Sequence, residues 1–255
     1  MKHISILIIL LACQLAVRGQ TATTYSCDCR TDTLFHEDFG TGPGTANYYV
    51  VGYVFTPGAS TAYSEARTYT QNASPPASIG IQDGYYLVAN GDNANMFGAW
   101  MKPCYDHTRG DRSGMYMIIN GDSKLIKMYG LTFSGLVPGE KLFFSFFVAS
   151  MINAANAGGK SKPHIILYVR DPYDSHIIKF ADTGEVPNDQ KWHEEGIPIT
   201  VPEGYTSLIF EFINQQLDTN GNDLGIDDIM VRACKRNFLP VNPNIRGNFV
   251  EPEGN

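Results

Sequence analysis

The chain has 255 residues and a formal net charge of −7, from 19 basic and 26 acidic side chains. This acidic balance argues against nucleic acids and anionic membranes as partners, because both need clustered Lys and Arg. The 14 Tyr and 14 Phe residues far outnumber the 2 Trp residues, which favours a core rich in β-strands.

The first 19 residues have the pattern of an export signal. Lys2 and His3 precede a short, mainly apolar run, Ile4–Leu11, and small and polar residues follow as far as Gly19. The run is too short to span a bilayer, which needs about 20 apolar residues, and no later segment is apolar enough to do so. We therefore expect a signal peptide over residues 1–19 and a secreted or cell-surface protein. Lipid anchoring at Cys13 is the alternative.

Four cysteines follow the expected cleavage site, and they are Cys27, Cys29, Cys104 and Cys234. An even number of cysteines in an exported chain implies disulfides. Cys27 and Cys29 are too close in sequence to pair comfortably, so we expect one bridge from each. One of these bridges then joins the two ends of the domain. A zinc site is disfavoured, because zinc needs close ligand pairs on both sides.

After a Cys-containing lead over residues 20–30, short strand-like segments follow one another between polar turns. They are Leu34–Gly40, Tyr49–Phe55, Tyr85–Ala89, Met115–Asn120, Leu125–Phe133, Leu142–Met151, Ile165–Val169, Ile177–Phe180, Trp192–Thr200, Leu208–Ile213 and Ile226–Ala233. No segment after the leader keeps a helical period for ten residues. The pattern predicts an all-β, antiparallel two-sheet sandwich over residues 31–235. Residues 236–255 are rich in Pro and Asn and are typical of a linker or tail.

Two of these strands, near the two ends of the domain, carry an acid on their apolar face. Alternation places Asp227 on the inward face of Ile226–Ala233, and it places Glu37 on the inward face of Leu34–Gly40. An inward carboxylate is costly unless a cation or several donors meet it. The sequence therefore predicts that the N- and C-terminal strands are adjacent, with a hard cation between them.

Short motifs are spaced along most of the chain, and they are Glu37–Gly40, Asp106–Thr108, Gly114–Met117 with Asn120, Gly130–Leu131, Leu136–Gly139 and Gly221–Ile229. Together they resemble a jelly-roll module of surface and adhesion proteins from gliding and gut bacteria. Such modules are similar to MAM domains and to galactose-binding-like carbohydrate-binding modules. The resemblance implies a non-catalytic jelly-roll sandwich with a structural Ca²⁺ near the junction of its first and last strands.

The candidate metal ligands are five acids, namely Glu37, Asp38, Asp106, Asp227 and Asp228. Ca²⁺ takes six to eight oxygen ligands from carboxylates, backbone carbonyls and water. The alternative is that Asp227 and Glu37 lie at the rim of the sandwich and accept backbone N–H bonds as turn caps.

Aromatic residues near Cys104 are the candidate ligand-binding residues. Phe97, Trp100 and Tyr105 lie in a loop-like region, where their rings can stack on a sugar or contact a protein partner. The alternative is that Trp100 packs beneath the disulfide of Cys104. The sequence shows no clear pair of exposed tryptophans that would mark a platform for sugars.

Motifs of common hydrolases are absent from the sequence, including the Gly-x-Ser-x-Gly elbow and the Glu-x-Asp-x-x-Glu pattern of sandwich glycosidases. We therefore expect a non-catalytic extracellular binding or adhesion module that recognises a glycan or a cell-surface protein, with Ca²⁺ as a structural cofactor. The alternatives are a purely structural domain of a larger surface assembly and a polysaccharide-active enzyme.

Overall fold

The computed structural model describes residues 31–42, 49–50, 52–66, 81–90, 106–108, 111, 113–153, 155 and 157–234. This part of the chain forms strands β1 (Thr31–Glu37), β2 (Tyr49–Val50), β3 (Ala59–Ser60), β4 (Ser64–Glu65), β5 (Tyr85–Asn90), β6 (Met115–Ile119), β7 (Lys127–Ser134), β8 (Lys141–Ser150), β9 (His164–Arg170), β10 (Ile177–Glu185), β11 (His193–Thr200), β12 (Ser207–Asn214) and β13 (Leu224–Cys234). It contains no α-helix. Within these residues, no helix is long and apolar enough to cross a membrane.

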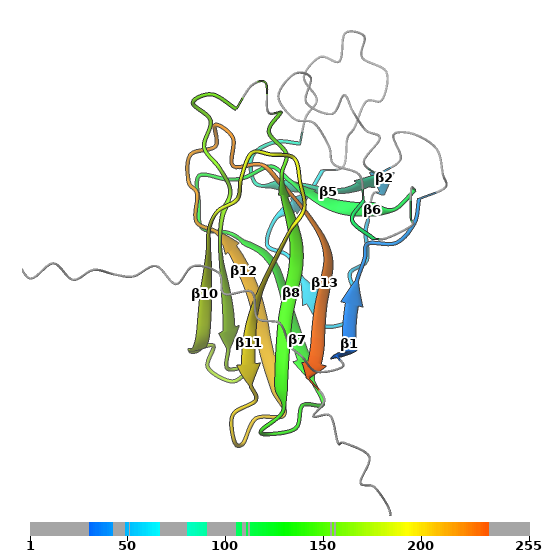
Figure 1. Ribbon diagram of the computed structural model, residues 1–255, viewed down its shortest axis with the longest axis vertical. Coiled ribbons are helices and arrows are strands. Elements are labelled where there is room, and N and C mark those ends of the chain that lie inside the picture. Colours follow the sequence, from blue (N-terminus) through cyan, green and yellow to red (C-terminus); the bar gives the residue numbers. More distant parts are fainter. Residues whose placement is uncertain are drawn as a thin grey trace, which may run out of the picture.

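The strands form two sheets that pack face to face (Figure 1). The first has eight strands in the order β11-β8-β13-β6-β5-β2, with β1 paired to β13 and β4 paired to β5. The second has five strands in the order β10-β9-β12-β7-β3. Every pair is antiparallel except the short contact between β4 and β5. The predicted all-β, two-sheet jelly-roll sandwich is confirmed.

The first and last strands are neighbours, as the sequence predicted. Strand β1 runs antiparallel to β13, from the pair Thr31 and Cys234 to the pair Glu37 and Ile229. Glu37 lies opposite Ile229, which is fully buried, so this acid does face the interior. The two ends of the domain are thus joined by backbone hydrogen bonds.

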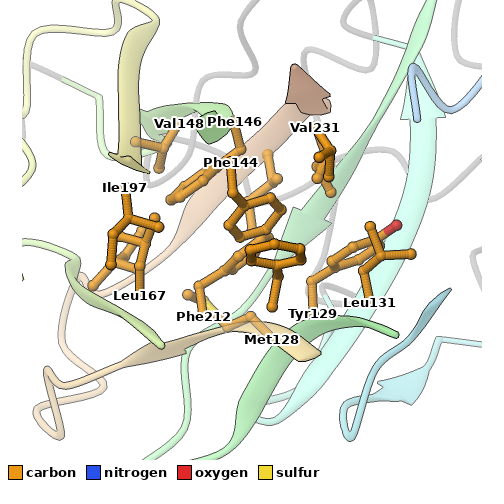
Figure 2. Packing of buried hydrophobic residues seen from close by; sticks show 14 of the residues in the cluster. Met128, Tyr129, Leu131, Phe144, Phe146, Val148, Leu167, Ile197, Phe212 and Val231 are labelled. Carbon is orange, nitrogen blue, oxygen red and sulfur yellow. The ribbon is translucent and has the colours of Figure 1, made fainter. Parts of the chain in front are cut away.

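Aromatic rings from both sheets form the centre of the core (Figure 2). Phe144 and Phe146 of β8 stack on Phe210 and Phe212 of β12, with ring centroids 4.7 Å and 4.3 Å apart. Tyr129 of β7 stacks on Phe212 at 5.4 Å. Each fully buried ring contributes roughly 1.5–3 kcal/mol from the apolar surface that it removes from water. The stacks between β8 and β12 therefore join the two sheets across the core.

The segment predicted as a strand over Tyr49–Phe55 is a strand only at Tyr49–Val50. The carboxylate of Glu65, and not a neighbouring strand, is the partner of the backbone at Gly52 and Tyr53. The N–H groups of Gly52 and Tyr53 both donate to Oε1 of Glu65, at 2.6 Å and 3.0 Å. The pattern of Tyr49–Phe55 does not predict this interaction, because Glu65 lies outside the segment.

A β-bulge interrupts β13 at its acidic pair. Asp227 lies opposite Phe147 of β8, and the next paired residue, Met230, lies opposite Ser145, so β13 has one extra residue. Asp228 has a φ of 45°, a conformation that Asp tolerates better than most residues. The extra residue reverses the alternation, so Asp227 faces away from the core side that carries Ile229. The predicted sharing of one face by these two residues is therefore wrong.

The bulge lies where β13 changes its neighbour. Before the bulge, Leu224–Ile226 pair with β6. After it, Ile229–Cys234 pair with β1. Strand β8 accompanies β13 on its other side throughout. Asp227 and Asp228 thus lie where the neighbour of β13 changes from β6 to β1, with β8 on the other side of the strand.

Candidate metal centre

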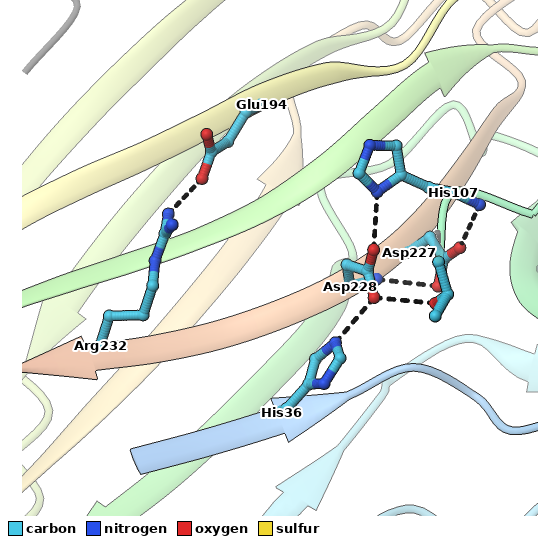
Figure 3. Close-up of polar contacts among 7 residues, drawn as sticks. His36, His107, Glu194, Asp227, Asp228 and Arg232 are labelled. Atoms are coloured by element: carbon cyan, nitrogen blue, oxygen red, sulfur yellow. Dashed lines mark hydrogen bonds and ion pairs between the residues drawn. The ribbon is translucent and has the colours of Figure 1, made fainter. Parts of the chain in front are cut away.

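Asp227 is fully buried, and two backbone N–H groups hold its carboxyl group. His107 N donates to Oδ2 and Asp228 N donates to Oδ1, each at 2.8 Å (Figure 3). The segment Asp106–Thr108 therefore lies against β13 at the bulge. This arrangement agrees with the turn-cap alternative for Asp227, but it leaves further lone pairs of the carboxyl group available.

Asp228 accepts hydrogen bonds from three side chains. They come from His36 Nε2 at 2.7 Å, His107 Nδ1 at 2.6 Å and Thr108 Oγ1 at 2.9 Å (Figure 3). Burial acts to raise the pKa of Asp228, but these bonds outweigh burial and hold the pKa below its usual value. Its oxygens are thus engaged by donors within the protein.

His107 is fixed by an aromatic contact as well as by Asp228. Its ring stacks on Phe147 with 3.5 Å between centroids and meets the edge of Trp192 at 6.0 Å. His36 lies opposite Met230 on the strand that pairs with the bulged part of β13. Neither histidine was predicted as a site residue, although each is next in sequence to a predicted acid.

The carboxyl groups of Asp106 and Asp227 lie within hydrogen-bonding reach of each other. Both oxygens of Asp106 are buried, and no donor in the described part of the chain meets them. Burial raises the pKa of Asp106, and burial together with the neighbouring Asp106 raises the pKa of Asp227. Two ionised carboxylates cannot remain in contact in a buried site unless a proton or a cation lies between them. The donor set of this pair consists of hard carboxylate oxygens, and the two of Asp106 have no N–H partner in the described residues, which fits Ca²⁺.

The other two predicted ligands are directed elsewhere. Glu37 is buried, with Oε1 accepting from Tyr53 OH at 2.7 Å and Oε2 accepting from Thr56 N at 3.1 Å and Thr56 Oγ1 at 2.9 Å. Asp38 Oδ1 accepts from Gly40 N at 3.0 Å in a local turn. The structure therefore brings together Asp106 and Asp227 and gives Glu37, Asp38 and Asp228 other partners.

A second group of possible metal ligands was not predicted from sequence. Asp171, Asp174 and His176, in the turn between β9 and β10, have ligand atoms within 4.8 Å of one another. Tyr205 OH donates to Asp171 at 2.7 Å, and His176 Nδ1 lies 2.7 Å from Asp174. These contacts already satisfy the group as a polar network that shapes the turn.

Several predicted residues lie outside the described part of the chain. They are the candidate ligand-binding residues Phe97, Trp100 and Tyr105, and three of the cysteines, Cys27, Cys29 and Cys104. Cys234 ends β13 beside Thr31. The disulfides and the aromatic ligand site therefore stay predictions.

No known protein family matches this sequence, and no curated protein matches it. Among solved structures, the chain is similar to the apo form of a cyclase from Fischerella sp., at 13% identity over 77% of this chain and 92% of that one, with a TM-score of 0.47. It is also similar to the CBM22-1 xylan-binding domain from Paenibacillus barcinonensis, at 13% identity over 80% and 96%, with a TM-score of 0.38.

A third similar structure is the enzymatically active domain of tailspike protein 4 from bacteriophage CBA120, at 10% identity over 49% of this chain, with a TM-score of 0.35. The chain spans 16% of that domain's length. All three TM-scores are below 0.5.

Proposed function

We propose that the protein is an exported, non-catalytic binding module for a glycan, with a structural Ca²⁺ between Asp106 and Asp227. The observation that carries the metal is the pair of buried Asp106 oxygens, which meet no donor in the described residues and lie against a second carboxyl group. Asp106 and Asp227 would supply two ligands, and backbone carbonyls and water would supply the rest.

The bound cation would act on the architecture of the site. It would join Asp106 to the bulge of β13, where the neighbour of that strand changes from β6 to β1. The backbone bond from His107 to Asp227 already links the same two segments. A cation there would therefore stabilise the junction of the terminal strands.

A polysaccharide-active enzyme is the second candidate, because two carboxyl groups with raised pKa values are also a feature of acid–base catalysis. Burial opposes it. Asp227 is fully buried and is held by backbone N–H groups, so a substrate would have no direct path to its oxygens. This geometry favours a structural role for the pair.

The metal is tested by thermal unfolding of the full chain with added Ca²⁺ and with EDTA. We expect Ca²⁺ to raise the Tm, because it binds only the folded state. At a Ca²⁺ concentration one hundred times Kd, the free energy of unfolding should rise by about 2.7 kcal/mol. The double variant Asp106→Asn, Asp227→Asn should lose the response. The control Asp38→Asn should keep it. An unchanged Tm of the native protein in Ca²⁺ and EDTA would exclude a tightly bound structural cation.

The binding role is tested with a glycan array and a panel of soluble polysaccharides. Retention of a glycan without turnover supports the proposal. Release of reducing ends or unsaturated products that stops in Asp106→Asn would instead identify an enzyme. Binding to surface proteins alone, or to nothing, would favour an adhesin or a purely structural domain.

A further inference from the structure

The outer face of the five-stranded sheet carries more apolar side chains than is usual for a sheet face in contact with water. Strand register places three rows of residues across it. The first row is Ile177, Arg170, Ile209 and Thr132, and the second is Phe180, Tyr168, Glu211, Gly130 and Ser60. The third row is Asp182, Ile166, Ile213 and Lys127. Phe180 is 63% exposed and Ile177 is 46% exposed. An antiparallel sheet with one face in water normally shows polar residues there. Exposed apolar groups gathered on one face mark a surface that binds something.

A ladder of charged groups crosses the middle of this face. Arg170 Nε donates to Glu211 Oε2 at 2.8 Å, and Lys127 Nζ lies 3.6 Å from Glu211 Oε1. Lys127 Nζ also reaches Ser60 Oγ at 3.4 Å. The charges therefore alternate over β9, β12 and β7, and the ladder ends at the hydroxyl of Ser60 on β3.

Two close contacts shape the surface between these groups. The guanidinium of Arg170 lies 4.6 Å above the ring of Tyr168. Gly130 has no side chain, and Lys127 lies across it, with Cδ only 2.9 Å from where a Cβ would be. Five strands spaced about 4.8 Å apart give a width of roughly 19 Å, which is long enough for several sugar units in a row.

We infer that this face binds a neutral polysaccharide chain laid across the strands. A pyranose ring presents an apolar face of C–H groups that matches the exposed ring of Phe180. Its hydroxyls both donate and accept, so they can bond Glu211 on one side and Arg170 or Lys127 on the other. The inference rests on the proposed binding function and gives it a site distinct from Phe97, Trp100 and Tyr105.

Charge favours this occupant over an anionic one. Arg170 and Lys127 both pair with Glu211. Asp182 in the third row supplies a second negative charge, so the face has no excess charge that a neutral ligand would leave unpaired. An anionic polymer would instead meet Glu211 in the centre of the face. The net charge of −7 also disfavours such a ligand.

The inference is tested on the full chain by affinity gel electrophoresis and titration calorimetry with hydroxyethylcellulose, xyloglucan and galactomannan, and with polygalacturonate as the anionic probe. We expect binding to at least one neutral polymer. Phe180→Ala and Glu211→Gln should each weaken it about tenfold or more, as the loss of a main binding contact does. Tyr173→Ala, an exposed aromatic in the turn outside the three rows, should change it less than about twofold. Circular dichroism and melting confirm that each variant folds.

Three results would overturn the inference. Binding that both face variants keep but Trp100→Ala loses would place the site at the loop and leave the proposed function intact. Binding to polygalacturonate alone would exclude the neutral ligand. Binding to none of the polymers would reject both this site and the proposed glycan-binding function.

Discussion

The carboxyl group of Asp106 lies directly against the Cα of Gly114, so that any Cβ at position 114 would overlap it. Gly114→Ala must therefore displace Asp106 from Asp227. We expect the variant to lose the response of its Tm to Ca²⁺ and about 1–3 kcal/mol of stability, as for other overpacked sites. Gly158→Ala is the control, because Gly158 has open space around it and no positive φ. A Gly114→Ala protein with an intact Ca²⁺ response would contradict the assignment.

Glu37 should stabilise the fold without taking part in metal binding. Its oxygens accept three hydrogen bonds from Tyr53 and Thr56. Glu37→Gln keeps the shape but removes the charge and one acceptor, so we expect a loss of about 1–3 kcal/mol in urea unfolding. The Tm shift on adding Ca²⁺ should match that of the native protein. If that shift disappears, Glu37 is a ligand after all.

Phe212 should be among the most sensitive positions of the core. It stacks on Phe146 and Tyr129, and it is fully buried. Phe212→Ala should cost about 3–5 kcal/mol of unfolding free energy, the usual range for a buried ring. The matched change Phe180→Ala, on the exposed face, should cost less than about 0.5 kcal/mol. Equal losses at both sites would contradict the assignment of these two residues to the core and the surface.

Asp223 should make stability fall as pH rises. Burial is the main cause that raises the pKa of Asp223 to about 7. An acid whose pKa is raised in the folded state does not destabilise that state below its unfolded pKa of about 4, because it is protonated in both states. Above that pH, the cost of ionising the buried group grows until the pH passes the folded pKa. Asp223→Asn should therefore gain stability relative to the native protein between about pH 4 and 7, by at most on the order of 4 kcal/mol. Urea unfolding across this range checks it, and parallel curves for the two proteins would contradict it.

The strands were largely readable from the sequence because their apolar residues alternate with polar ones and their turns contain Gly and Pro. The pairing of β1 with β13 was predicted from two inward acids, Glu37 and Asp227, but only Glu37 points to the core, and its hydrogen-bond partners lie outside β13. Those partners, Tyr53 and Thr56, could not be read in advance. They lie in an irregular segment, where no periodicity reports which way a side chain points.

The acidic site could be predicted from the sequence even less completely than the strands. Simple alternation assigned Asp227 to the core face, and the bulge moved it to the other face. Nothing in the local pattern announces the bulge, because Asp228 adopts its positive φ without a glycine. The approach of Asp106 and His107 depends on contacts about 120 residues away in the chain, which residue spacing does not encode.

The position of β13 has a consequence for how the molecule comes into being. This strand separates β8 from β6 in the larger sheet and also carries β1, so until residues 224–234 have been synthesised that sheet exists as disconnected pieces. Closure then joins segments from opposite ends of the domain, a topology that folds slowly. The larger sheet is therefore completed only by the last strand in the chain, so assembly of the sandwich follows synthesis of that strand.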